Sequence, residues 1–181
     1  MQVSDTIQPK DNEGVLHVPA GCGLGLWFNG NTYSVKVSTN ETNGRIAFVE
    51  ASIPPGCGSP PHIHLREDEI FYLLSGELEF LDSDRTFLAR QGDFVMIPRG
   101  RRHRFMNVGV HVAKTIFLFT PAGFERLFLE MGRPAKAGEP APLWGPEEMA
   151  RVTDLAPLFG FELVPDAVFQ RPSGRESEPG P

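Results

Sequence analysis

The 181-residue sequence is poor in three features that would each indicate a different class of protein. It has no long apolar run, only two cysteines, Cys22 and Cys57, and no excess of positive charge, with a net charge of −6. The first absence argues against a membrane protein, the second against a disulfide-stapled secreted domain, and the third against a nucleic-acid partner. We expect a soluble protein with two free thiols and without a nucleic-acid or membrane partner.

The motifs of several large enzyme classes are also missing from the sequence. There is no Gly-x-Ser-x-Gly for a nucleophilic serine, no phosphate-binding Gly-x-x-x-x-Gly-Lys and no dinucleotide fingerprint. The first residues, MQVSDTIQPKDNEG, lack the basic start and the apolar segment of a secretory signal. The expected location is therefore the cytoplasm.

Glycine and proline are abundant instead, with 19 and 17 residues, and they separate short runs of strand-like sequence. Asn29-Gly30 is a strong hairpin signal because both residues tolerate positive φ. Val15–Val18 is predicted as a first edge strand, and turns follow every eight to twelve residues up to about residue 119. This spacing predicts an all-β sandwich or barrel over residues 15–120, preceded by a flexible arm over residues 1–14.

The sequence changes character at Thr120, where a helical extension with its linker is predicted over residues 121–165. Thr120 is a candidate helix cap and Gly132 a candidate helix end. An apolar stripe at helical spacing, Phe124, Leu127, Phe128 and Met131, is expected to pack against the barrel, with ligand binding as the alternative. Residues 166–181 are predicted to be a disordered tail.

Three residues near the middle of the chain have the spacing of metal ligands. His62 and His64 are two residues apart, so in a strand both side chains project to the same face. Glu69 follows a short charged turn, at the start of the apolar strand Ile70–Leu74. Two imidazoles and a carboxylate suit a first-row divalent metal ion. Arg99, Arg101, Arg102 and Arg104 form a basic run that is expected to be solvated or paired with nearby acids.

These residues belong to two motifs that resemble those of the cupin superfamily. The first motif is represented by Gly56, His62, His64, Glu69 and Gly76, and the second by Gly92, Pro98, Gly100, His103 and Asn107. The resemblance implies a single jelly-roll barrel in which His103 joins the other three ligands around one divalent transition metal. The metal can be iron, manganese, nickel, cobalt, copper or zinc. The resemblance also implies a homodimer.

Sequence around the motifs is similar to single-domain bacterial cupins grouped with quercetin dioxygenases. The similarity implies a metal-dependent dioxygenase of a flavonol-like or other enolic or phenolic aromatic substrate, with Glu69 as ligand and general base. By alternation, Phe71 and Leu73 lie on the same strand face as Glu69, and Phe105 lies on the same face as His103. These three side chains are therefore candidate pocket walls. Two alternatives remain, because one barrel hosts many reactions. They are a metal-dependent isomerase, lyase or decarboxylase of a small oxo or hydroxy acid, and a non-catalytic small-molecule-binding cupin.

Overall fold

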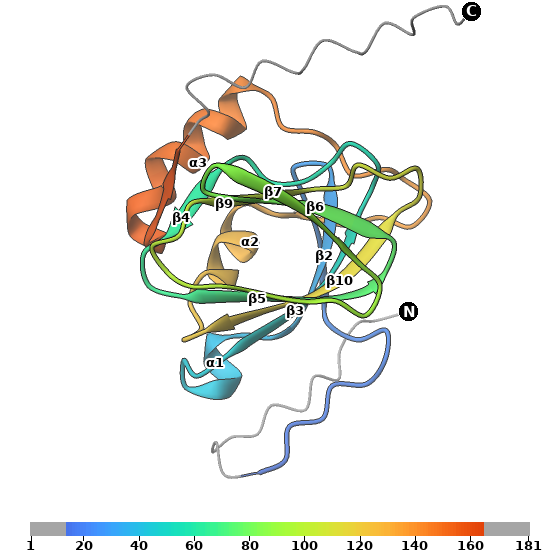
Figure 1. Cartoon of the computed structure of the whole chain (residues 1–181). Helices are drawn as coiled ribbons and strands as arrows, with labels where there is room; N and C mark the ends of the chain where they lie inside the picture. The colour runs from blue at the N-terminus through green and yellow to red at the C-terminus, as the bar shows by residue number, and fades with distance from the viewer. Residues whose placement is uncertain (1–13, 165–181) are drawn as a thin grey trace, which may run out of the picture.

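The computed structural model describes residues 14–164, which form two antiparallel sheets closed into a barrel (Figure 1). The larger sheet contains, in spatial order, β11 (Arg133–Pro134), β1 (Leu24–Phe28), β2 (Asn31–Val37), β3 (Ala47–Ile53), β10 (Ala113–Thr120), β5 (Asp68–Ser75) and β8 (Phe94–Ile97). The smaller sheet contains β12 (Phe161–Leu163), β4 (His62–His64), β9 (His103–Met106), β6 (Glu77–Asp82) and β7 (Arg85–Arg90). The predicted all-β jelly-roll fold with a C-terminal helical extension is confirmed.

Three helices complete the described structure: α1 (Thr39–Thr42), α2 (Glu125–Met131) and α3 (Pro146–Phe159). Figure 1 shows α2 behind the barrel opening and α3 beside β4, outside the ring of strands. The predicted tail over residues 166–181 and the predicted arm, except for Gly14, lie outside the described residues. In the described part of the chain, no helix combines the length and the apolar character needed to cross a membrane.

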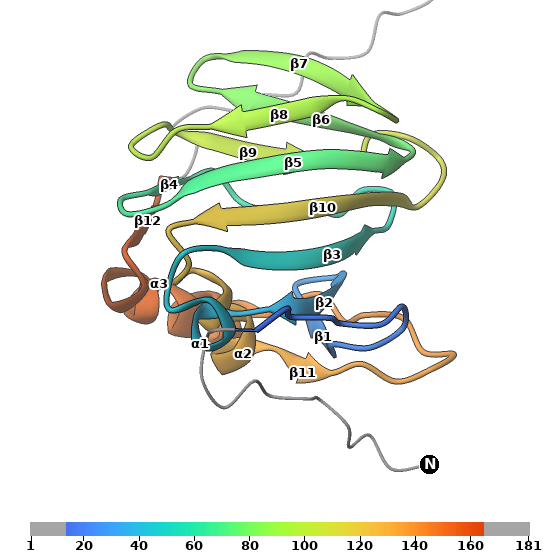
Figure 2. The same cartoon turned by 90° about the horizontal axis from the view of Figure 1, so that it is seen from below.

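Alternation along the strands places an aromatic core between the two sheets. In β3 every second residue from Ala47 to Ile53 is buried, and β5, β10 and β3 lie side by side (Figure 2). The Phe71 ring lies 4.5 Å from that of Phe117 and 4.8 Å from that of Phe80, between ring centroids. Phe117 is the neighbour of Phe71 on the adjacent strand of the same sheet, whereas Phe80 lies on β6 of the facing sheet. Both contacts are what a two-residue period predicts when one face of each strand is buried.

The beginning of the chain follows the sequence expectations only in part. The predicted hairpin at Asn29-Gly30 joins β1 to β2, and both residues have positive φ, 48° and 77°. The expected strand over Val15–Val18 is wrong, because these residues belong to no strand. The short run has no partner strand to supply hydrogen bonds.

The end of the barrel differs from the expectation at Thr120. This residue does not cap a helix, because β10 continues through it and pairs it with Asp68 of β5. Helix α2 begins only at Glu125 and ends before Gly132, its C-cap. The predicted stripe Phe124, Leu127, Phe128 and Met131 is buried.

The C-terminal extension also contributes strands. β11 pairs with β1, and β12 pairs with β4, with Leu163 opposite His62. The extension therefore completes both sheets and lies directly beside the strand that carries two of the predicted ligands.

Polar groups around the barrel follow the sequence expectations. Both cysteines are free. Members of the basic run pair with acids: Arg99 with Asp68 at 3.0 Å, Arg104 with Glu79 at 2.9 Å, and Arg101 with Asp82. Arg99, Arg101 and Arg104 are therefore paired with acidic residues of the same chain, as expected for the basic run.

Gly58 shows how closely the loop before β4 packs on β9. A Cβ atom at Gly58 would lie 2.1 Å from the carbonyl oxygen of Phe105 and 2.8 Å from the Cα of Met106. Backbone atoms cannot give way as a flexible side chain can. We expect Gly58→Ala to lower the free energy of unfolding by about 3 kcal/mol, measured by urea denaturation. Gly14→Ala, in open space, is the control; equal stability of both variants would contradict the packing argument.

Candidate metal centre

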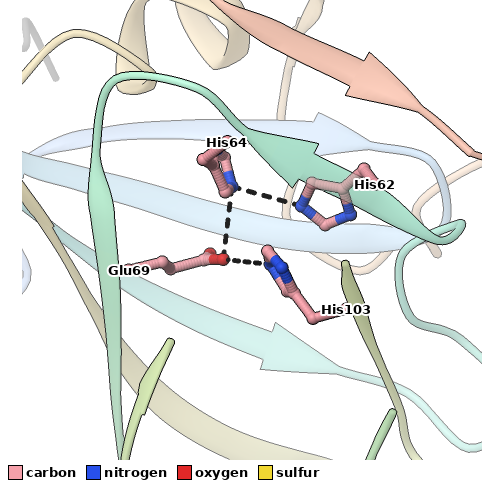
Figure 3. A group of neighbouring side chains, drawn as sticks. All are labelled: His62, His64, Glu69 and His103. Atoms are coloured by element: carbon pink, nitrogen blue, oxygen red, sulfur yellow. Dashed lines mark hydrogen bonds and ion pairs between the residues drawn. The ribbon is translucent and has the colours of Figure 1, made fainter. Parts of the chain in front are cut away.

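Four buried side chains converge inside the barrel, His62, His64, Glu69 and His103 (Figure 3). His62 and His64 project from the same face of β4, and His103 stands opposite His62 on β9. Glu69 reaches them from β5 in the facing sheet. One ligand atom from each residue can be chosen so that all four lie within 4.8 Å of one another. The structure thus brings the four sequence-predicted ligands together.

The donor atoms face one another at short distances. Nε2 of His103 lies 2.8 Å from Oε2 of Glu69, and Nε2 of His64 lies 3.3 Å from the same oxygen. Nε2 of His62 lies 3.2 Å from Nε2 of His64. No member of the cluster is more than 6% exposed. The cluster therefore concentrates three ring nitrogens and a carboxylate in a space that water barely reaches.

Backbone carbonyls fix the orientation of two of the imidazoles. Nδ1 of His62 lies 2.8 Å from the carbonyl oxygen of Pro60, and Nδ1 of His103 lies 2.9 Å from that of Arg101. With a metal bound, a proton on each Nδ1 would donate to the carbonyl and leave the Nε2 lone pair for the ion. Burial and the nearby His103 and His64 lower the pKa of His62 well below its ordinary value. His62 is therefore neutral at pH 7, as a metal ligand must be.

Glu69 is the negative charge of the cluster. Burial alone would raise its pKa, but hydrogen bonds with His103 and His64 outweigh burial and hold the pKa well below its usual range. The carboxylate is therefore ionised. An anionic oxygen and three imidazole nitrogens suit a first-row divalent ion. A cation between the Nε2 atoms of His62 and His64 would also relieve the repulsion between their two facing lone pairs. The donor set fits a metal ion, and the cluster could hold one.

A narrow cavity of about 50 Å³ opens beside His62 and Glu69. Its walls are mainly aromatic and come from the barrel and from the C-terminal extension. The lining includes Phe28, Tyr33, Phe105, Phe117, Phe124, Leu127, Phe128, Trp144, Val152, Phe161 and Leu163. The helical stripe of α2 therefore packs on the barrel and also lines the cavity through three of its members.

The candidate pocket walls predicted from the sequence have different positions. Phe105 lines the cavity, whereas Phe71 and Leu73 do not. Both share the inward face of β5 with Glu69, as alternation predicts, but both are completely buried. Each pair of residues advances about 6.6 Å along a strand, so Phe71 and Leu73 lie deeper in the barrel than Glu69. A pocket role for these two residues therefore remains a prediction that the lining of this cavity does not support.

Sequence reasoning missed Tyr33 and Trp144. Tyr33 is 3% exposed and lines the cavity, and burial, followed by the Glu69 charge, raises the pKa of its hydroxyl group. Its alternation with polar neighbours in β2 could have placed it inside. Trp144 lies in the predicted linker, and its ring lies 4.3 Å from that of Phe28 between centroids. No local pattern predicts this contact.

Comparisons with known proteins agree with this geometry. Residues 49–119 match the family model described as Cupin domain. The chain is 28% identical over 149 residues to polyketide synthase CurC of Streptomyces cyaneus, covering 82% of each chain. It is also 38% identical over 82 residues to oxalate oxidase GF-3.8 of Triticum aestivum, covering 41% of this chain and 37% of that protein. The chain spans about a third of the length of the plant relatives it matches.

Among solved structures, the fold resembles that of a predicted oxalate decarboxylase from Thermotoga maritima, with a TM-score of 0.55 and 20% identity. The match covers 59% of this chain and 99% of that one. At this level of identity the likeness concerns the fold alone. The match of residues 49–119 to the Cupin domain model, the two motifs and the barrel agree with one another and support the predicted membership of the cupin superfamily.

Proposed function

We propose that this protein is a metal-dependent enzyme that uses dioxygen to oxidise an enolic or phenolic aromatic compound, as a quercetinase does. The observation that carries the proposal is that two members of the four-residue cluster, His62 and Glu69, line a cavity with mainly aromatic walls. Among the described lining residues there is no lysine or arginine. A planar, uncharged ring matches such walls better than a small dianion, which needs cationic partners.

The chemistry of the site supports an acidic hydroxyl group on the substrate. A divalent metal bound by His62, His64, Glu69 and His103 would lower the pKa of a substrate hydroxyl. Glu69, an ionised carboxylate that lines the cavity, is placed to accept that proton. Its pKa is low, so it is a weak base and requires a substrate whose own pKa is lowered. The apolar walls keep water from the reacting group.

The resemblance to CurC supports the same substrate class, since polyketide chains carry enolisable carbonyl groups. The size of the cavity limits the candidates further. About 50 Å³ is far below the roughly 300 Å³ of a pocket for a drug-sized ligand. A flavonol therefore enters only if lining side chains move, and those of the C-terminal extension, such as Trp144, are the candidates. Single-ring enols and catechols require less movement.

The test is anaerobic metal loading followed by an oxygen-uptake assay. The protein is loaded separately with iron, manganese, nickel, cobalt, copper and zinc, and the metal content is measured. Flavonols and catechol-like compounds are then supplied with air. We expect oxygen uptake that depends on both the metal and the aromatic substrate. Absence of uptake with every metal and substrate would overturn the dioxygenase assignment.

A second candidate is a metal-dependent lyase, decarboxylase or isomerase of a small oxo or hydroxy acid. The small cavity favours it. The similarity to oxalate oxidase GF-3.8 supports a small acid as substrate but not the oxygen-free reaction, because an oxidase consumes oxygen. Such an enzyme would convert its substrate without oxygen, so turnover under strictly anaerobic conditions distinguishes it from the dioxygenase. A cupin that only binds its ligand would show ligand binding by calorimetry and no product in either atmosphere.

The homodimer also remains a proposal. Light scattering of the purified chain tests it directly, because a dimer has twice the 20.0 kDa mass of the single chain. A mass of one chain at micromolar concentration would contradict it.

A further inference from the structure

A second carboxylate lies beside the cluster, on the side of His64 that faces away from the other ligands. Glu67 belongs to the turn between β4 and β5, is only 2% exposed, and places Oε2 3.9 Å from Nδ1 of His64. Neither of these two buried atoms has a hydrogen-bond partner in the described structure. Buried polar atoms without partners are rare and costly, so two of them facing each other call for an explanation.

His64 differs in this respect from the other two histidines of the cluster. His62 and His103 each have a backbone carbonyl oxygen within 3 Å of Nδ1. His64 has none, and Glu67 occupies the corresponding side of its ring. A metal-binding histidine usually donates its second N–H to a carbonyl or a carboxylate, which fixes the ring and strengthens the ligand.

We propose that Glu67 is a positioning residue of the metal centre, which accepts a hydrogen bond from Nδ1–H of His64 when Nε2 binds the metal. The inference rests on the proposed metal binding, although not on the proposed reaction. Closing the gap from 3.9 Å to a hydrogen-bond distance requires a movement of about 1 Å. Glu67 thereby supplies through its side chain what Pro60 and Arg101 supply through their carbonyls.

The loop before α2 is shaped to admit this carboxylate. A Cβ atom at Gly123 would lie 2.8 Å from Oε1 of Glu67, so a side chain there would displace the carboxylate. The backbone N–H of Gly123 is held by Oε2 of the buried Glu125 at 2.7 Å. This hydrogen bond fixes the Gly123 backbone, so that the position where a Cβ atom would stand stays next to the carboxylate of Glu67.

The experiment compares zinc affinity in the full chain by competition with a chromophoric chelator. We expect Glu67→Gln to weaken zinc binding about tenfold, because the amide still accepts a hydrogen bond, and Glu67→Leu to weaken it up to about 100-fold. Asp68→Asn is the matched control, since Asp68 is the next residue along the chain, carries a carboxylate and pairs with the exposed Arg99 at the start of β5. Its affinity should stay within about twofold of that of the wild type.

A spectroscopic readout separates positioning from a merely structural role. In the zinc-loaded protein, NMR should show the Nδ1–H proton of His64 farther downfield than those of His62 and His103. In Glu67→Gln this signal alone should move upfield, while the metal-free variant melts no lower than the metal-free wild type. Wild-type affinity and an unchanged His64 signal in the variant would overturn the role of Glu67 alone. Failure of the wild type to bind zinc would overturn the metal centre itself.

Discussion

Glu69→Gln is expected to lower kcat by a factor of about 10² to 10⁴ while the protein keeps much of its metal. The amide retains an oxygen at the position that now lies 2.8 Å from Nε2 of His103 and 3.3 Å from Nε2 of His64. It lacks the basicity to accept a proton from the substrate. Metal content and single-turnover rates with bound substrate separate the two roles of Glu69, as ligand and as base.

The control for this prediction is Glu79→Gln on β6. Glu79 is also a glutamate on the barrel wall, but it pairs with Arg104 at 2.9 Å and does not line the cavity. Its variant should turn over substrate within about twofold of the wild-type rate. Normal turnover in metal-loaded Glu69→Gln would remove Glu69 from the role of base and leave it as a ligand only.

Metal binding is expected to stabilise the wild-type protein by about 4 kcal/mol at a free metal concentration 1,000 times the Kd. For a chain of this length that corresponds to a rise in Tm of about 8–16 °C, reversed by a chelator. His103→Ala should abolish the rise, because it removes one of the four ligands from a buried cluster. Differential scanning calorimetry with and without metal measures the effect.

The informative quantity is the metal-dependent shift and not the Tm itself, since replacing a buried histidine lowers stability on its own account. His111→Ala provides the matched control, because His111 is exposed and lies outside the cluster. It should keep the full shift. An equal shift in His103→Ala and the wild type would mean that the metal binds elsewhere.

The ligand cluster was predictable because its geometry is local. Two histidines two residues apart share a strand face in any sheet, and the structure places His62 and His64 in that way on β4. Glu69 is the second residue of β5 and His103 the first of β9, and both are buried. Spacing alone predicted that His62, His64 and Glu69 could share one site. His103 was added only by the family resemblance. The bringing together of β4, β5 and β9 was implied only by the family resemblance.

The cavity was not predictable in the same way because its walls are assembled from distant segments. Trp144 comes from a stretch without regular structure and meets Phe28, 116 positions earlier in the chain. Phe161 lies on β12, a three-residue strand that is too short for alternation to be recognised. Its pairing with β4 depends on how α3 returns to the barrel. Such long-range contacts leave no periodic pattern in the sequence.

The pocket walls on β5 show where alternation stops being sufficient. It assigned Phe71 and Leu73 correctly to the face of Glu69, but it carries no information about depth. Phe71 packs against Phe80, Phe105 and Phe117 and closes the space beyond the cluster. The open side of the cluster faces the C-terminal extension instead. The substrate proposals therefore depend on the part of the chain that the sequence described least well.

The most direct test of the account is a crystal structure of the metal-loaded protein, with the ion located by anomalous scattering. We expect one ion per chain, about 2.0–2.2 Å from Nε2 of His62, His64 and His103 and from a carboxylate oxygen of Glu69. An ion held by other residues, or no ion in protein crystallised with excess metal, would contradict the central claim.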